Sequence, residues 1–113
     1  MKKIKTLKMN YEFKNVFSKG KYYIEDQIIV YSLKNKLNYI RLGIAINSKL
    51  CNAVKRNKIK RLIRASYQNI DIKSQEGYDI VFIWNKKEPI EKASYNQIYN
   101  DMKKAFSKIG IIE

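Results

Sequence analysis

Basic residues recur at helical spacing between positions 53 and 68, and their types suit phosphate binding. Arg56, Lys60 and Arg64 lie four residues apart, which places them in one row along a helix. Guanidinium groups bind phosphate through two parallel hydrogen bonds, and ammonium groups act as point charges. Three further polar side chains lie beside this row: Asn57, Arg61 and Gln68. The pattern predicts a helix face that binds the backbone of a nucleic acid.

The other side of the same predicted helix carries its apolar residues. Val54, Ile59, Leu62 and Ala65 cluster on a helical wheel, and we expect them to pack on a sheet. No acidic residue interrupts the basic face, although like charges four residues apart destabilise a helix by roughly 0.2–0.5 kcal/mol per pair. A helix selected only for stability would intersperse Glu. A solvated basic face without a ligand is the alternative interpretation.

Aromatic residues are frequent in the same part of the chain, at Phe13, Phe17, Tyr22, Tyr23, Tyr31 and Tyr39. Bases of single-stranded RNA stack on such rings while phosphates meet cations, so this mixture suits RNA. Phe13 and Phe17 also share helical spacing with Val16, and that spacing by itself favours a core role.

Residues for protein-based catalysis are scarce. The chain contains no His, which removes the most common general base and zinc ligand, and its single Cys51 cannot form an internal disulfide. Several acidic residues in the C-terminal part have no spacing that indicates a metal site; they are Asp71, Glu76, Asp79 and Glu88. A self-sufficient hydrolase is therefore not expected. Because the single Cys cannot form an internal disulfide, a cytoplasmic location is expected.

The net charge of +14 lies entirely in the first 70 residues. That part holds 17 Lys and Arg against three acidic residues, whereas residues 71–113 hold seven of each. Coding bias could explain many of the Lys residues. It explains poorly why three of the four Arg residues fall between positions 56 and 64. The asymmetry predicts a polyanionic partner.

The elements that position these residues follow from hydrophobic periodicity. We expect helices over residues 11–19, 53–68 and 95–108, capped by Asn10, Asn52 and Ser94. We expect a strand over residues 22–33, with a break near positions 25 and 26, and a second strand over residues 39–47. A third strand, over residues 78–85, is expected in the centre of the sheet. The short connection between the first two strands predicts that they pair antiparallel.

This order of elements, α-β-β-α-β-α with one further strand allowed, predicts an α+β sandwich. We expect a small, mostly antiparallel sheet with helices packed on it. The 113 residues suit a single RNA-binding domain, in which residues 1–8 form a flexible basic N-terminus. No run of 18 apolar residues is present, so no transmembrane helix is expected.

One segment resembles the protein subunit of bacterial ribonuclease P. The family carries Arg-x-Gly in a strand and then Ala-Val-x-Arg-Asn-basic-apolar-Lys-Arg-x-x-Arg in a helix. This chain has Arg41-Leu42-Gly43 and then Ala53-Val-Lys-Arg56-Asn57-Lys-Ile-Lys60-Arg61-Leu-Ile-Arg64. Residues 13–20 also resemble the family's Phe-x-x-Val-Phe-x-x-Gly stretch, and the resemblance extends over roughly residues 8–110.

The resemblance implies a fold with a left-handed βαβ crossover and a protein that joins a large catalytic RNA. That RNA, with Mg²⁺ bound chiefly to it, cuts the 5′ leader from precursor tRNA. The residues implied to contact RNA are Arg41, Lys49, Asn52, Arg56, Asn57, Lys58, Lys60, Arg61 and Arg64, and the residues implied to line a leader-binding cleft are Phe13, Phe17 and Tyr31. Cys51 departs from the pattern, because the family usually has Gly there.

Three other function classes are weighed against this hypothesis. A structural RNA-binding protein, such as a ribosomal protein, would show the same charge. A helix-turn-helix DNA-binding module is disfavoured because the basic helix follows a predicted strand. A stand-alone nuclease is disfavoured by the spacing of the acidic residues. The sequence leaves open whether the protein itself binds a metal.

Overall fold

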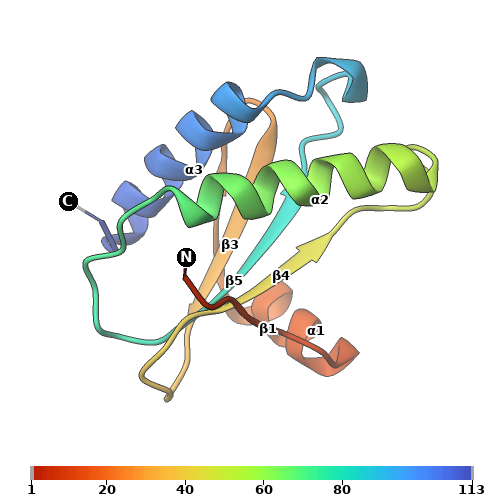
Figure 1. Ribbon diagram of the computed structural model, residues 1–113. Coiled ribbons are helices and arrows are strands. Elements are labelled where there is room, and N and C mark those ends of the chain that lie inside the picture. Colours follow the sequence, from red (N-terminus) through yellow and green to blue (C-terminus); the bar gives the residue numbers. More distant parts are fainter. Residues whose placement is uncertain (1, 113) are drawn as a thin grey trace.

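The computed structural model describes residues 2–112 and contains one five-stranded sheet with helices on both faces (Figure 1). The strands lie in the order β1-β4-β5-β3-β2. Their bounds are Lys5–Thr6 (β1), Lys21–Ile24 (β2), Ile28–Lys34 (β3), Arg41–Ala45 (β4) and Tyr78–Trp84 (β5). The helices are Asn10–Lys19 (α1), Ala53–Gln68 (α2) and Tyr95–Ile109 (α3), with a 3-10 turn at Ile90–Lys92. The predicted α+β sandwich is confirmed.

Strand β5 is central, as its apolar residues on both faces predicted. It pairs antiparallel with β3 and parallel with β4. The prediction that β3 and β4 pair directly is wrong, because β5 lies between them. The sheet is mixed, because β1–β4 and β4–β5 are parallel while β2–β3 and β3–β5 are antiparallel. The antiparallel pairings join more residues than the parallel ones, which agrees with the predicted, mostly antiparallel sheet. A strand that is apolar on both faces buries the most surface in the centre.

Helices α2 and α3 cover one face of the sheet, and α1 covers part of the other (Figure 1). The larger core joins Ile63 of α2 and Phe106 of α3 to Phe82 of β5, all fully buried. The smaller core joins Val16 of α1 to Val81, the next residue of β5 before Phe82. Successive side chains of a strand point to opposite faces of the sheet, so Val81 and Phe82 contribute to the two cores on opposite sides of β5.

Helix α2 connects the parallel neighbours β4 and β5. In Figure 1 it lies above the sheet, both strands run from left to right, and β4 lies in front of β5. This arrangement makes the crossover left-handed, as the family resemblance implies, whereas right-handed connections dominate among βαβ units.

The N-terminal segment contacts the fold, although the sequence predicted a flexible segment there; residue 1 lies outside the described residues. Strand β1 adds a parallel edge to β4, and Leu7 is 6% exposed. Lys2 Nζ donates to the carbonyls of Tyr67 and Ile70 at the C-terminal end of α2, where a cation interacts favourably with the helix dipole. A two-residue strand has too few residues to show a period, so the sequence did not reveal it.

Helix α1 begins one residue earlier than predicted. Its N-cap is Met9, and the predicted cap Asn10 is the first helical residue. The capping oxygen comes from Glu12, whose Oε1 accepts the backbone N–H groups of Lys8 and Met9 at 2.8 Å each. This is the half of a capping box in which the carboxylate of the third helical residue accepts the N–H of the N-cap, while the N–H of Glu12 itself donates to the backbone carbonyl of Met9 at 3.0 Å.

Candidate nucleic-acid interface

The predicted cap of α2 is confirmed. Asn52 Oδ1 accepts the backbone N–H of Lys55 at 2.9 Å. This hydrogen bond satisfies one of the free N–H groups in the first turn of the helix. Because the amide oxygen of Asn52 is used in this way, its NH₂ group is the part that remains for an external ligand.

Arg56 holds the loop that precedes α2. Its Nη1 donates to the carbonyl of Cys51 at 2.7 Å and to that of Ser48 at 3.4 Å. No non-glycine residue within residues 2–112 has positive φ, so Cys51 adopts its position without left-handed strain. Lys49 lies exposed in this loop. Arg56 therefore positions the loop and its Lys49 relative to the helix.

Helix α2 is rotated relative to the predicted packing face. Val54 is 76% exposed and Ala65 is also exposed, so their predicted packing role is wrong, while Ile59 is buried and Leu62 half-buried. The residues of α2 that are buried are Ile59, Ile63, Ser66 and Tyr67. Apolar residues occur on two sides of this helix, and the side that packs into the core is the one where Ile59, Ile63 and Tyr67 follow one another at intervals of four residues.

The rotation leaves a row of basic residues on one flank of α2. Asn57, Lys58, Arg61 and Arg64 are exposed, and Lys60 is half-buried. On this flank and in the loop before it, five basic side chains form neither an ion pair nor a side-chain hydrogen bond within residues 2–112, whereas Lys55 pairs with Glu91 and Arg56 bonds to carbonyls. We call these five the free cations: Lys49, Lys58, Lys60, Arg61 and Arg64. A cation without a carboxylate partner can bind phosphate without losing an existing contact.

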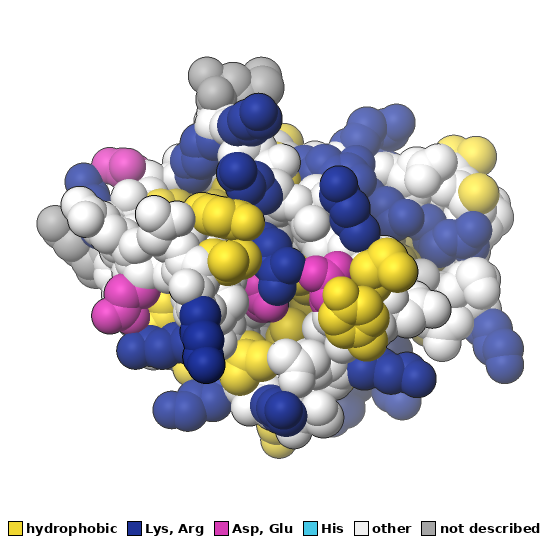
Figure 2. Space-filling model, turned by 90° about the horizontal axis from the view of Figure 1, so that it is seen from below, with side chains coloured by type: hydrophobic (Ala, Val, Ile, Leu, Met, Phe, Trp, Pro, Cys, Tyr) yellow, Lys and Arg dark blue, Asp and Glu magenta, His cyan; other side chains and the backbone are white. Residues whose placement is uncertain are grey.

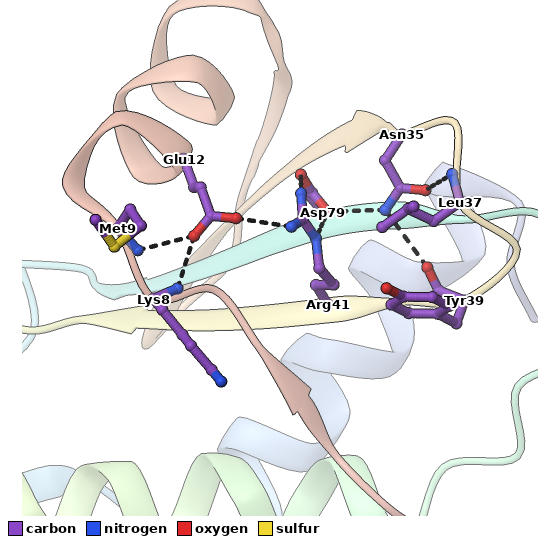
Figure 3. Close-up of polar contacts among 8 residues, drawn as sticks. All are labelled: Lys8, Met9, Glu12, Asn35, Leu37, Tyr39, Arg41 and Asp79. Carbon is purple, nitrogen blue, oxygen red and sulfur yellow. Dashed lines mark hydrogen bonds and ion pairs between the residues drawn. The ribbon is translucent and has the colours of Figure 1, made fainter.

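Arg41 lies in a different environment, at the junction of α1, β4 and β5 (Figure 3). Its Nε and Nη2 donate to the two oxygens of Asp79 at 2.8 and 2.7 Å, and its Nη1 donates to Glu12 at 2.7 Å. Asn35 Nδ2 adds a hydrogen bond to Asp79 at 2.8 Å. One guanidinium between two carboxylates carries a net charge of 1 − 2 = −1. This charge balance disfavours a phosphate at Arg41.

Hydrogen bonds and neighbouring charges shift the pKa values of Glu12 and Arg41 in this cluster. The backbone N–H groups of Met9 and Lys8, together with the Arg41 guanidinium, lower the pKa of Glu12. The hydrogen bonds and charge of Asp79 raise the pKa of Arg41. Both shifts favour the ionised forms. Because Glu12 also caps α1, the ionised cluster links the start of α1 to the sheet.

The predicted leader-cleft residues have unequal exposure. The rings of Phe17 and Tyr31 meet edge to face with centroids 4.9 Å apart, and Phe17 is 40% exposed. Tyr22 lies opposite Tyr31 in the β2–β3 register, 5.7 Å from it, and is 61% exposed. We call Phe17, Tyr22 and Tyr31 the aromatic cluster. Tyr22 was not among the predicted site residues, although its strand pairing could have indicated it.

Phe13 is half-buried and packs across Gly43. A Cβ atom at Gly43 would lie 2.5 Å from Phe13 Cε1, so glycine at this position gives the ring its space. The face that carries α1 shows Lys and Arg side chains around hydrophobic side chains and a few carboxylates (Figure 2). Phe13 therefore combines a packing role with a position next to the aromatic cluster.

The acidic residues considered for a nuclease site are separated and mostly paired. Asp71 binds Lys73, Glu76 binds Lys34, and Asp79 binds Arg41. No group of three or more potential ligands that could hold a metal ion occurs within residues 2–112. The helices in that range are also too short or too polar to cross a membrane.

Comparison with known proteins finds relatives along almost the whole chain. Residues 1–110 match the family described as Ribonuclease P. A "Ribonuclease P protein component" from Thermoanaerobacter sp. (strain X514) is 34% identical over 107 residues, covering 95% of this chain and 90% of that protein. The component from Clostridioides difficile (strain 630) is 44% identical over 80 residues, 70% of each chain.

Solved structures show the same fold. The RNase P protein of Staphylococcus aureus has a TM-score of 0.80 at 32% identity and covers 98% of this chain and 100% of that chain. The RNase P protein of Thermotoga maritima has a TM-score of 0.80 at 28% identity, covering 92% and 96%.

Proposed function

This chain belongs to the ribonuclease P protein family, whose complex is a tRNA-processing ribonucleoprotein, and from that premise we propose that it binds the catalytic RNA and the 5′ leader of precursor tRNA. The RNA subunit performs the cleavage. The protein contributes binding surfaces in the cytoplasm and acts without a membrane partner.

The observation that carries this proposal is the set of free cations on and before α2. Five positive groups lie on the helix flank and the adjoining loop, with Asn57 exposed beside them. Neutralising RNA phosphates with such groups releases counterions, which supplies a large share of protein–nucleic acid affinity. The aromatic cluster on the other side of the sheet offers stacking surfaces to an unpaired leader.

The chemical step is assigned to the RNA because the chain lacks the residues for it. The sequence has no His and a single Cys, and its acidic residues lie far apart in the fold or in ion pairs. We propose that the Mg²⁺ ions of the reaction are bound chiefly by the RNA. Protein cations then replace part of the screening that Mg²⁺ supplies.

The test is cleavage of precursor tRNA by the cognate RNA subunit at low Mg²⁺, with and without this protein. We expect strong stimulation that is lost when Arg61 and Arg64 are both changed to Ala. Lys104→Ala, an exposed change on α3, is the matched control and should leave stimulation unchanged. RNA binding without stimulation would instead indicate a structural RNA-binding protein.

Arg56→Ala is a second variant with a different expected effect. Because Arg56 holds the carbonyls of Cys51 and Ser48, its loss should also release the loop that carries Lys49. Its effect on RNA affinity should therefore exceed that of Arg61→Ala, in which only one exposed cation is removed.

A further inference from the structure

Strand β2 is an outer strand of the sheet, and one of its edges has no neighbour. It pairs with β3 alone, at the end of the strand order opposite β1. The N–H of Glu25 donates to the carbonyl of Ile28 at 3.0 Å, which fixes the direction of the backbone groups along β2. Because these groups alternate in an antiparallel pair, Tyr23 points its N–H and carbonyl to β3, whereas Tyr22 and Ile24 point theirs away from it. Within residues 2–112, nothing hydrogen-bonds to these outward backbone groups of Tyr22 and Ile24.

The usual protection of an outer strand is weak in β2. Natural proteins commonly protect such an edge with proline, a β-bulge or charged side chains. Strand β2 contains no proline, and its four residues pair with β3 in an unbroken register. Ile24 is 60% exposed. One exposed cation, Lys21, remains, and it opposes pairing with another basic strand and favours an acidic one.

A basic pocket adjoins the Lys21 end of this edge, on the face of the sheet that carries α3. Its volume is about 440 Å³, and cations from α1, β2 and β3 line it: Lys19, Lys21 and Lys34. Lys34 pairs with the exposed Glu76, whereas Lys19 and Lys21 form no ion pair in the described part of the chain. Ser32 also lines the pocket and is 7% exposed, and its hydroxyl has no hydrogen-bond partner among residues 2–112. The pocket therefore offers two unpaired ammonium groups and a hydroxyl donor, which suit a carboxylate.

We propose that β2 binds an extended acidic segment of another protein, which adds a strand to the sheet. Backbone hydrogen bonds to Tyr22 and Ile24 supply affinity, and side chains that alternate between the two faces supply specificity. Apolar side chains of the partner lie beside Ile24 on the α1 face, and its carboxylates lie beside Lys19 and Lys21 on the α3 face. The carboxylates belong at this end of the edge, because Asp26 follows β2 at the other end.

A peptide matches this edge better than RNA or a second copy of the chain. An RNA phosphate could bind Lys19 and Lys21, but a nucleic-acid backbone has no strand-like row of N–H and carbonyl groups to pair with β2. A second copy would bring another Lys21 to the edge, and the net charge of +14 would oppose its approach. The inference goes beyond the proposed function and does not depend on it, because it uses the backbone of Tyr22 and not the ring.

The first experiment measures amide hydrogen exchange of the full chain by NMR. The probe is a capped seven-residue peptide that alternates Glu and Val; the controls are the same peptide with Lys in place of Glu and a single-stranded oligouridylate. We expect the Glu peptide at saturation to slow exchange of the Tyr22 and Ile24 amides about tenfold or more, and both controls to leave them unchanged.

Four results of this experiment would overturn the proposal. No slowing by the Glu peptide would show that the edge does not accept a strand, and equal slowing by the Lys peptide would show that charge does not select the partner. Greater slowing by the oligouridylate would identify RNA as the occupant. Slowing that rises with protein concentration alone, together with a dimer in analytical ultracentrifugation, would identify a second copy.

The second experiment changes the edge itself. Ile24→Pro removes an outward N–H and no hydrogen bond to β3, so the strand should persist, and Ile24→Val is the matched control that keeps the N–H. We expect Ile24→Pro to weaken binding of the Glu peptide about tenfold or more and Ile24→Val to change it little. Unchanged affinity in Ile24→Pro, with unchanged thermal melting, would overturn strand addition.

Lys21→Glu tests the charge preference without altering the backbone of β2. It should weaken binding of the Glu peptide and strengthen binding of the Lys peptide, because the exposed cation at the edge becomes an anion. This variant keeps the proposal testable if Ile24→Pro melts early. An unchanged ratio of the two peptide affinities would overturn the assignment of an acidic partner.

Discussion

Replacing Arg41 by Met should destabilise the protein while leaving RNA binding by α2 intact. The Asp79 side chain is 6% exposed and accepts two hydrogen bonds from Arg41 and one from Asn35. Removing one partner of a buried pair costs about 3–5 kcal/mol, because the other charge stays buried. The Arg41 side chain is 25% exposed, and solvent screening lowers the expected loss to about 2–3 kcal/mol. For a chain of this length that corresponds to a melting temperature lower by about 10 °C.

The assay combines thermal unfolding with RNA affinity measured well below the melting temperature. Arg61→Met is the matched control, since Arg61 is exposed and belongs to the free cations. It should melt within a few degrees of the original protein and bind RNA more weakly. Adding Asp79→Asn to Arg41→Met should recover part of the lost stability, because the uncompensated charge is removed. If Arg41→Met melted normally and lost RNA affinity, Arg41 would be an RNA contact and our reasoning about its ion pairs would be refuted.

Three further predictions concern the free cations, the cap of α2 and the carboxylate of Glu12. The logarithm of RNA affinity should fall with the logarithm of salt concentration with a slope of about −3.5 to −4.5, if all five free cations neutralise phosphates; a slope near zero in filter-binding titrations would contradict the charged interface. Asn52→Ala should lower the free energy of unfolding by about 1 kcal/mol through loss of the α2 cap, measured by urea denaturation, with Asn52→Ser as the conservative control. Because the pKa of Glu12 is lowered by folding, its stabilising contribution is present above its unfolded pKa and is lost as pH falls through the folded value. Glu12→Gln should therefore reduce stability at neutral pH, and the difference should vanish in strong acid; a constant difference would show that ionisation is not the cause.

Local patterns predicted the elements of the fold and the identity of the basic helix. The bounds of α2 and the caps Asn52 and Ser94 are confirmed, because capping and periodicity depend on residues within one or two turns. Strand β5 was recognised as central from its apolar character on both faces. The basic residues of α2 were also visible in the sequence, since their charge and spacing require no knowledge of the partner element.

Interactions between distant residues decided what the sequence left open. The pairing of β4 with β5 instead of β3, the short β1 edge, and the rotation of α2 depend on which surfaces pack best across the whole chain. Arg41 shows the consequence for the site: its side chain alone is a phosphate ligand, but the fold brings Glu12 and Asp79 to it, 29 and 38 positions away in the sequence. The sequence by itself determined the secondary structure and the positive charge. The tertiary structure determined which of the cations remain unpaired, because a carboxylate that neutralises a cation can come from any part of the chain.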